Sequence, residues 1–213
     1  MLVSAMTVAD SVLSTLRAEP LAAVRARVRD GDILLCSGRD PFSRLIGWAT
    51  ESPWTHVALA YRWPQAGRIL VFESVQQFGV RVVTLERFCS QSSTGQRPYP
   101  GNIILARHEG YAAKGGKPGG TGMQRLVDAA VDRLGDNFAP GEILRIGLRI
   151  ALGRTGGQTP RWLRPRDEYI CSEYVARCLA KVAIDIPWDG RGFIAPADFA
   201  KDPLIKAVAK IKT

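Results

Sequence analysis

The chain has 213 residues, of which 46% are apolar and 23% are charged, and its net charge is +9. This length supports one domain with a hydrophobic core, and the composition excludes a disordered chain, a fibre and a disulfide-stabilised mini-protein. The positive charge favours an acidic partner, such as an anionic membrane surface or a cell-wall polymer. Because the basic residues form no continuous run, a solvated basic surface also explains the charge. The sequence has no nucleic-acid-binding motif, so nucleic acid is not expected as a partner.

The chain has four cysteines, at Cys36, Cys89, Cys171 and Cys178. None of their spacings is that of a CxxC pair and there are only two histidines, so neither a structural metal site nor a cofactor is expected. No stretch of 18 apolar residues is present to span a membrane, and the N-terminus lacks the features of a signal peptide. We therefore expect a protein of the cytoplasm or of a membrane periphery, with export by another route left open.

Residues 7–30 have the pattern of an amphipathic helix that Pro20 ends or kinks. The apolar residues that share one face of this predicted helix are Val8, Val12, Leu13 and Leu16. We accordingly divide the chain into an N-terminal helical segment, residues 1–30, and a main domain, residues 31–213.

The main domain begins with strand patterns. Residues 33–36 predict a short strand, and Asp40-Pro41 predicts the start of a helix, because Asp is a good N-cap and Pro suits the first helical position. That helix is expected to stop near Ser52-Pro53. Four further strands are predicted as an antiparallel meander, and the first two are joined by a loop of hairpin length. Their ranges are 56–62, 68–74, 79–85 and 102–107.

The second half of the chain is predicted to be mainly helical. Residues 114–122 form a glycine-rich flexible loop, because no apolar side chain there can anchor it. Three amphipathic helices are predicted, over residues 121–134, 141–152 and 171–182, and a C-terminal tail follows them. The order of helix, strands and helices predicts the α+β class, with helices packed on one face of an antiparallel sheet.

Cys171 is the first residue of the predicted helix over 171–182. A thiol in that position lies at the positive end of the helix dipole, which stabilises a thiolate. The free backbone N–H groups of the same turn can hold an oxyanion. The position therefore suits a nucleophile, although a buried structural cysteine explains it as well, because Cys is often buried.

A nucleophilic thiol needs a proton acceptor, and the sequence offers two histidines. His108 ends the last predicted strand beside Glu109, and we interpret it as an exposed strand-end residue. His56 begins the first strand of the predicted hairpin. We take His56 as the candidate base, since the hairpin gives it a partner.

That partner is Glu73, at the end of the second hairpin strand. If Arg62 pairs with Gly67 across a four-residue loop, His56 lies directly opposite Glu73 on the same face of the sheet. The carboxylate would then fix the tautomer of His56 and stabilise the imidazolium, as the third residue of a triad does. A one-residue slip would turn Glu73 to the other face, and a solvent-facing glutamate is the alternative.

Four segments occur in a particular order: GDILL, SPWTHVALAY, VFES followed by GV, and YICSEYVARCL. Together they resemble the circularly permuted papain-like cysteine hydrolases of the NlpC type, over roughly residues 30–200. In that family, and in the related lecithin retinol acyltransferase-like enzymes, the His-bearing strand precedes the Cys-bearing helix. The resemblance implies a papain-like fold with Cys171 as nucleophile, His56 as base and Glu73 as the third residue.

The resemblance also implies roles for residues near these three. Tyr169 matches an aromatic position just before the nucleophile and is expected to line the oxyanion site or the substrate together with Ser172. Tyr169 as a simple packing aromatic remains the alternative. Asp32 belongs to a recurring turn and is interpreted as structural.

The reaction that the resemblance implies is hydrolysis of an amide bond in a peptide or an acyl-amide, through a thiolate and an acyl-enzyme. A second hypothesis is a thiol acyltransferase or lipid hydrolase that uses the same Cys171 and His56 on a lipid-like acyl substrate. A third is a non-catalytic binding module on the same fold.

Overall fold

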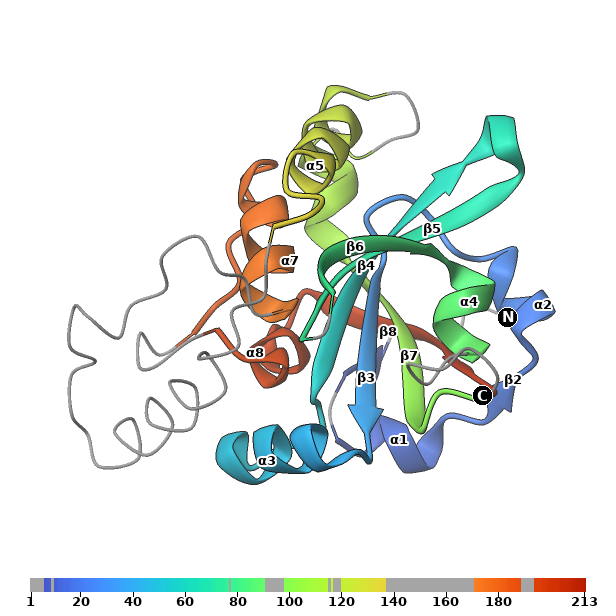
Figure 1. Cartoon of the computed structure of the whole chain (residues 1–213), viewed down its shortest axis with the longest axis vertical. Helices are drawn as coiled ribbons and strands as arrows, with labels where there is room; N and C mark the ends of the chain where they lie inside the picture. Colours follow the sequence, from blue (N-terminus) through green and yellow to red (C-terminus); the bar gives the residue numbers. More distant parts are fainter. Residues whose placement is uncertain are drawn as a thin grey trace.

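A β-sheet of eight strands runs through the described part of the chain, with helices on both faces (Figure 1). The structure is a computed structural model, and it describes residues 6–8, 10–76, 78–90, 98–114, 116, 120–136, 171–188 and 194–213. The strands are β1 (Met6–Thr7), β2 (Ala18–Glu19), β3 (Ile33–Gly38), β4 (His56–Trp63), β5 (Arg68–Val75), β6 (Gly79–Thr84), β7 (Gly101–His108) and β8 (Ile205–Ile211). The helices are α1 (Val12–Thr15), α2 (Leu21–Arg25), α3 (Pro41–Thr50), α4 (Leu85–Ser90), α5 (Thr121–Val131), α7 (Cys171–Ala180) and α8 (Pro196–Lys201), with 3-10 turns η1 (Pro64–Ala66) and η2 (Glu109–Lys114).

The sheet is mixed. Its strand order is β1-β8-β7-β3-β4-β5-β6, and the neighbours along this path run antiparallel. The short strand β2 lies off the path and runs parallel to β8. The strands β3 to β7 were predicted, and β4, β5 and β6 form the expected meander. The expectation that β7 closes this meander is wrong, because β7 pairs with β3 and β8 instead of β6. Strands β1, β2 and β8 were not predicted.

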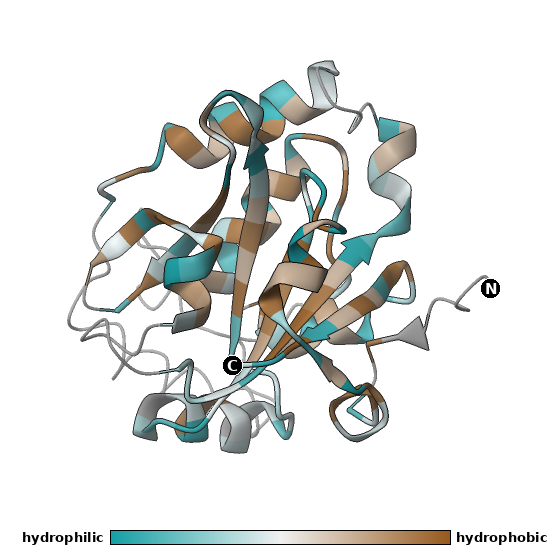
Figure 2. Ribbon diagram, turned by 90° about the vertical axis from the view of Figure 1, so that its right-hand side faces the viewer, coloured by the Kyte–Doolittle hydropathy of each residue, from teal (hydrophilic) through white to brown (hydrophobic). Residues whose placement is uncertain are grey.

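The central strands are buried on both faces. Residues 33–36, 57–60 and 103–106 are all buried, and such continuous apolar runs are typical of strands covered on both sides. Helices α5, α7 and α8 pack on one face, and α2 and α4 pack on the other. Figure 2 shows the apolar residues concentrated along the strands between these layers. The α+β class is confirmed, but the expectation that helices cover only one face is wrong.

The N-terminal segment is not the helix that its periodicity predicted. Helices α1 and α2 are four and five residues long, and β1 and β2 both pair with β8. Val12 is buried in the core on one face of the sheet, while Val24 is buried in the core on the other. A single straight helix cannot serve two opposite cores, so the segment breaks and passes around the sheet edge, with Pro20 at the N-cap of α2.

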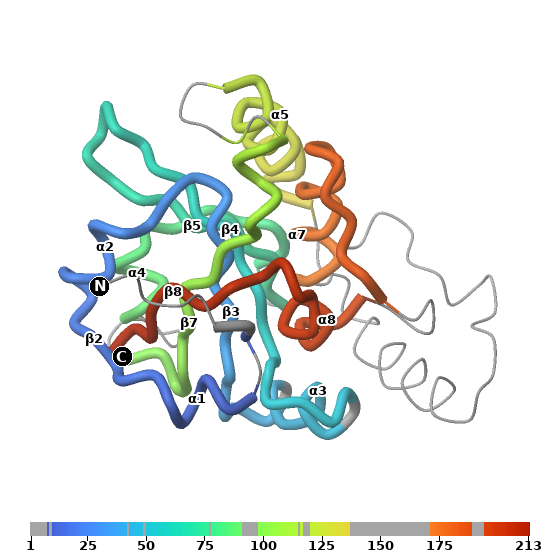
Figure 3. The backbone as a smooth tube through the Cα atoms, turned by 180° about the vertical axis from the view of Figure 1, so that it is seen from behind, coloured from blue at the N-terminus to red at the C-terminus, as the bar shows by residue number. Residues whose placement is uncertain are grey.

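The C-terminal residues were predicted as a tail, but they form α8 and β8. Strand β8 lies between β1 and β7 rather than at an edge, and Figure 3 shows it beside β7. Its inward residues Ile205, Ala209 and Ile211 are buried. Three lysines within or just after this short strand give it a polar composition, and the apolar alternation is too brief to stand out from sequence alone.

The other predicted elements lie close to their expected ranges. Helix α3 begins at Pro41, and the Asp40 carboxylate accepts the backbone N–H of Ser43 at 3.0 Å, so the predicted cap is confirmed. Helix α7 begins at Cys171, as expected. The predicted helix over 141–152 and four of the nine residues of the glycine-rich loop over 114–122 lie outside the described residues. Every helix in the described ranges is too short or too polar to span a bilayer.

Asp32 has the structural role that was expected of it. Its carboxylate accepts two bonds from the Arg107 guanidinium, at 2.7 and 2.8 Å, and a third from the backbone N–H of Arg29 at 2.7 Å. Asp32 is 1% exposed, and a buried carboxylate is tolerated only when it is paired in this way. The turn at Gly31 thereby ties β3 to β7.

Replacing Gly31 by Ala is predicted to lower the free energy of unfolding more than replacing Gly67 by Ala. Its φ is +77°, and a Cβ there would overlap the Tyr111 ring, whereas Gly67 at φ +61° has nothing within 4 Å of a Cβ. Gly67→Ala should therefore cost only the left-handed backbone strain, roughly 1–2 kcal/mol. Gly31→Ala should cost roughly 1–3 kcal/mol more from overpacking. Urea unfolding of both variants checks this, and equal losses would show that the Tyr111 contact is unimportant.

Candidate active site

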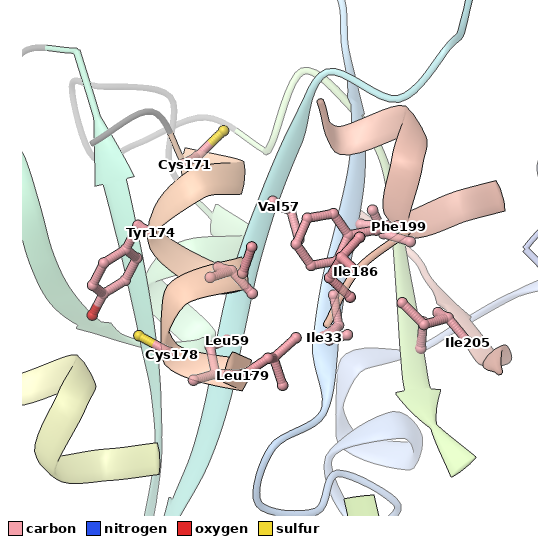
Figure 4. Close-up of a cluster of buried hydrophobic side chains, with 14 of the residues drawn as sticks. Ile33, Val57, Leu59, Cys171, Tyr174, Cys178, Leu179, Ile186, Phe199 and Ile205 are labelled. Atoms are coloured by element: carbon pink, nitrogen blue, oxygen red, sulfur yellow. The ribbon is translucent and has the colours of Figure 1, made fainter. Parts of the chain in front are cut away.

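Cys171 is the first residue of α7 and is 5% exposed. The helix is held against β4 and β5 by an apolar stripe that includes Tyr174, Val175 and Leu179. In Figure 4 the sulfur of Cys171 lies at the end of the helix and points away from this cluster, whereas Cys178 lies beside the apolar side chains. The packing therefore fixes a thiol at the positive end of the helix dipole.

His56 is the first residue of β4, and its side chain is 15% exposed. In the ladder with β3 its partner is Cys36, so both side chains lie on the same face of the sheet. The imidazole stacks on the ring of Phe88 from α4, with centroids 6.2 Å apart and planes 25° apart. Strand pairing and stacking together restrict the orientation of the imidazole.

Cys171 and His56 meet at one end of the sheet rather than across one of its faces. Helix α7 packs on the face that carries Val57 and Leu59. Because side chains alternate along a strand, His56 points to the opposite face. Each of the two residues begins its element, so the thiol and the imidazole can approach around the end of β4. The sulfur of Cys171 is hydrogen-bonded to the imidazole.

Glu73 lies on β5 and is 3% exposed. Its Oε2 is 2.9 Å from Nε2 of His56. Since Nε2 faces the carboxylate, Nδ1 is the ring nitrogen that remains for the thiol. The predicted contact between Glu73 and His56 is therefore present, and His56 lies between the thiol and the carboxylate.

The register that led to this prediction was wrong by two residues. Arg62 pairs with Ile69 instead of Gly67, because the loop is the turn η1 followed by Gly67 at positive φ. His56 and Glu73 are consequently diagonal neighbours and not directly opposite. Side chains repeat on one face every two residues, so an even shift leaves both groups on the same face, and diagonal neighbours remain within reach of long side chains.

Arg81 completes the group and was missed in the sequence. It is the direct partner of Glu73 in the ladder of β5 and β6. Its Nε donates to Oε1 of Glu73 at 2.8 Å, and Nη2 is 2.7 Å from the same oxygen. Its guanidinium also lies over the ring of Phe78, 5.0 Å from the centroid. The tight turn between Val75 and Gly79 fixes this register, and that short hairpin is the sequence signal that could have identified Arg81.

The two carboxylate oxygens are thus divided between two donors, and this determines which groups are charged. Burial raises the pKa of Glu73, but the hydrogen bonds and charges of His56 and Arg81 outweigh burial and hold the pKa below its ordinary value. Burial alone lowers the pKa of His56, but the sulfur of Cys171 and the carboxylate of Glu73 raise it to about 10. The two neighbours therefore favour the protonated form of His56.

Two other predictions about the site concern Ser172 and Tyr169. Ser172 is fully buried, and its hydroxyl donates to the carbonyl of Ile194 at 2.6 Å. Its side chain joins α7 to the segment before α8, and a role of Ser172 in lining the oxyanion site or the substrate stays a prediction. Tyr169 lies outside the described residues.

His108 is not the exposed residue that was expected. It is 5% exposed, its Nδ1 accepts the backbone N–H of Gly110 at 3.1 Å, and its Nε2 is 3.6 Å from Asp202. Burial lowers the pKa of His108 more than Asp202 raises it. Ile103 and His56 both pair with Cys36, so they lie at the same level of the sheet. His108 lies five residues further along β7, which places it roughly 17 Å from that level at 3.4 Å per residue. His108 is therefore not part of the candidate site.

The comparisons with known proteins find similarity to solved structures. No family model and no curated protein matches the chain. The crystal structure of the metalloprotein yiiX from Escherichia coli O157:H7 (DUF1105) is similar, with a TM-score of 0.58 and 18% identity, covering 87% of this chain and 98% of that chain. At this identity the likeness shows the α+β fold alone. Within the described ranges, no three His, Cys, Asp or Glu side chains are grouped to hold a metal ion.

Replacing Glu73 by Gln is predicted to lower the pKa of His56. The amide keeps the shape of the side chain but removes the anion that stabilises the imidazolium. In the parent, the cation persists at low pH and is lost as the pH rises through about 10. In the variant this loss should occur at lower pH, as measured by NMR titration of the imidazole. Glu86→Gln removes an exposed carboxylate that pairs with Arg25 and should leave the titration unchanged. Identical curves for parent and Glu73→Gln would contradict the assignment.

Proposed function

We propose that the protein is a cysteine hydrolase that cleaves an amide bond, with Cys171 as nucleophile, His56 as proton carrier and Glu73 as the group that orients His56. The observation that carries this proposal is the position of His56, which is hydrogen-bonded to the Cys171 sulfur on one side and to a buried carboxylate 2.9 Å away on the other. A thiol, an imidazole and an orienting acid in series are the requirements of thiol acyl chemistry.

In the proposed reaction, the thiolate of Cys171 attacks the carbonyl carbon and the carbonyl π electrons move to the oxygen. The first backbone N–H groups of α7 donate hydrogen bonds to that oxyanion, since they have no partner within the helix. The imidazolium of His56 gives its proton to the leaving nitrogen as the C–N bond breaks, leaving a thioester. A water molecule, deprotonated by the neutral imidazole, then attacks the thioester, and the acid leaves as the thiolate re-forms.

The order of the residues supports the family that the sequence resembles. His56 and Glu73 lie on adjacent strands and precede Cys171, which begins a helix. This is the arrangement of the permuted papain-like hydrolases of the NlpC type, and we propose that fold for this chain. The yiiX neighbour is described as a metalloprotein, but the donor atoms needed for a metal are not grouped in the described residues. No step of the proposed reaction uses a metal.

The charge of the molecule bears on the substrate. A net charge of +9 would concentrate anionic substrates or interfaces near the protein. We propose a peptide or a lipid-like acyl compound as substrate, presented on an anionic membrane surface or a cell-wall polymer. The same acyl-enzyme could pass its acyl group to an amine or an alcohol instead of water, which would make the protein an acyltransferase.

Cys171→Ala is predicted to abolish acyl-enzyme formation. After incubation with an N-acyl p-nitroanilide or an acyl thioester, the intact mass of the parent should increase by one acyl group, while the variant should gain none. Release of p-nitroaniline should fall by at least about 10³-fold, as when other catalytic nucleophiles are removed.

Cys178→Ala is the matched control, because Cys178 lies on the same helix and is fully buried. Burial raises the pKa of Cys178 and of Cys89 to about 12, so neither thiol should compete below pH 8, and this control should label like the parent. Equal labelling of Cys171→Ala and the parent would exclude the nucleophile, and no labelling of either would favour a binding module. Adding glycine methyl ester or a long-chain alcohol distinguishes an acyltransferase, which would form the transferred product, from a hydrolase, which would release the free acid.

A further inference from the structure

Arg81 is the nearest cation to Glu73 that the proposed reaction does not use. Its Nε and Nη2 both contact Oε1 of Glu73, at 2.8 and 2.7 Å, while Oε2 is left for His56. The side chain of Arg81 is 29% exposed and that of Glu73 only 3%. The arginine therefore extends from solvent to a carboxylate that has almost no water around it.

A carboxylate in that position would otherwise be a poor counter-ion. Desolvation favours its protonated form, and the nearest proton is the one on His56. Transfer of that proton to Glu73 would leave a neutral imidazole beside the thiolate, and the thiolate would lose its cationic partner. A fixed positive charge on Oε1 prevents this transfer, because it stabilises the carboxylate without itself giving up a proton.

We infer that Arg81 is a positioning residue of the candidate site, which keeps Glu73 ionised and so maintains the pairing of the His56 imidazolium with the Cys171 thiolate. This inference rests on the proposed function, because it assigns Arg81 a role through the same three residues. The site then has four members in series: arginine, glutamate, histidine and cysteine.

Phe78 supports the arrangement. Its ring lies 5.0 Å from the guanidinium carbon of Arg81, a cation–π geometry, although the ring is 55% exposed. An exposed aromatic at the tip of a hairpin gains little from burial, so its contribution is to limit the rotamers of Arg81. Its removal should loosen the guanidinium without changing any charge.

The inference is tested by the pH dependence of Cys171 alkylation with iodoacetamide, which requires no knowledge of the substrate. The rate is followed by mass spectrometry of the peptide that contains Cys171. In the parent the rate should fall on the acid side as the thiolate–imidazolium pair is protonated. In Arg81→Met this acid limb should move up by about 1 pH unit, since a neighbouring arginine lowers a carboxyl pKa by 1–3 units. On the limb itself, one unit is a tenfold loss of rate at fixed pH.

Three further variants make the result specific. Arg81→Lys keeps the charge and should recover at least half of the shift. Arg68→Met removes an exposed arginine from the far end of β5, the strand that carries Glu73, and should leave the limb in place. Phe78→Ala keeps every charge and should shift the limb in the same direction as Arg81→Met, by less.

The outcomes separate the inference from the proposed function. An acid limb in Arg81→Met that coincides with that of the folded parent would overturn the role of Arg81 and leave the proposed function intact. If Cys171 of the parent is alkylated like a free thiol, and His56→Gln leaves the pH dependence of alkylation unchanged, the result contradicts the proposed function itself. If Arg81→Met does not fold, Phe78→Ala decides: an unmoved limb in that variant would count against the inference.

Discussion

The candidate site depends on one buried carboxylate. Glu73 is almost without water, so both of its oxygens need a charged or polar donor for the ionised form to persist. Oε2 is paired with His56 and Oε1 with Arg81. These pairs tie three adjacent elements together, because His56, Glu73 and Arg81 lie on β4, β5 and β6. Stability of the sheet and charge in the site are therefore coupled: strand pairing brings the donors to the carboxylate, and the donors make its burial tolerable.

The sheet supplies the precision that this pairing requires. Because helices cover both faces of the sheet, the central residues of β3, β4 and β7 are buried on both sides. A shift in register would expose apolar side chains, so the register and orientation of these strands are strongly fixed. Helix α7 is docked on β4 and β5 by its own apolar stripe, and its first residue is thereby placed at the end of the same strand that His56 begins. Two rigid elements thus fix the thiol relative to the imidazole, in accord with the need for catalytic groups to be held within fractions of an ångström.

The sequence predicted the parts of the site that depend only on the alternation of side chains along a strand. It did not predict the parts that depend on the exact register between neighbouring strands. His56 and Glu73 were expected on one face and are there, because the two-residue error in register preserved the face. Arg81 follows from the β5 and β6 register, which the alternation of apolar residues does not specify by itself. The N-terminal residues were misjudged for a related reason: the apolar positions expected on one helix face, such as Val12, and the later Val24 serve two separate cores. Strand β8 depends on pairing with β7, about a hundred residues earlier in the chain, and such long-range contacts leave little local signal.

The four cysteines show why location in the fold, and not burial, singles out Cys171. All four are buried, so exposure does not distinguish a nucleophile from a structural residue. Burial raises the pKa of Cys36, Cys89 and Cys178. Cys36 even lies beside His56 in the ladder, but its sulfur is within a strand, where the backbone N–H groups are used by the sheet. Cys171 has an imidazole and a helix N-terminus together. In the proposed reaction the imidazole takes the proton of the thiol and the helix N-terminus holds the oxyanion. A thiol that had only one of these would lack either activation or stabilisation of the transition state.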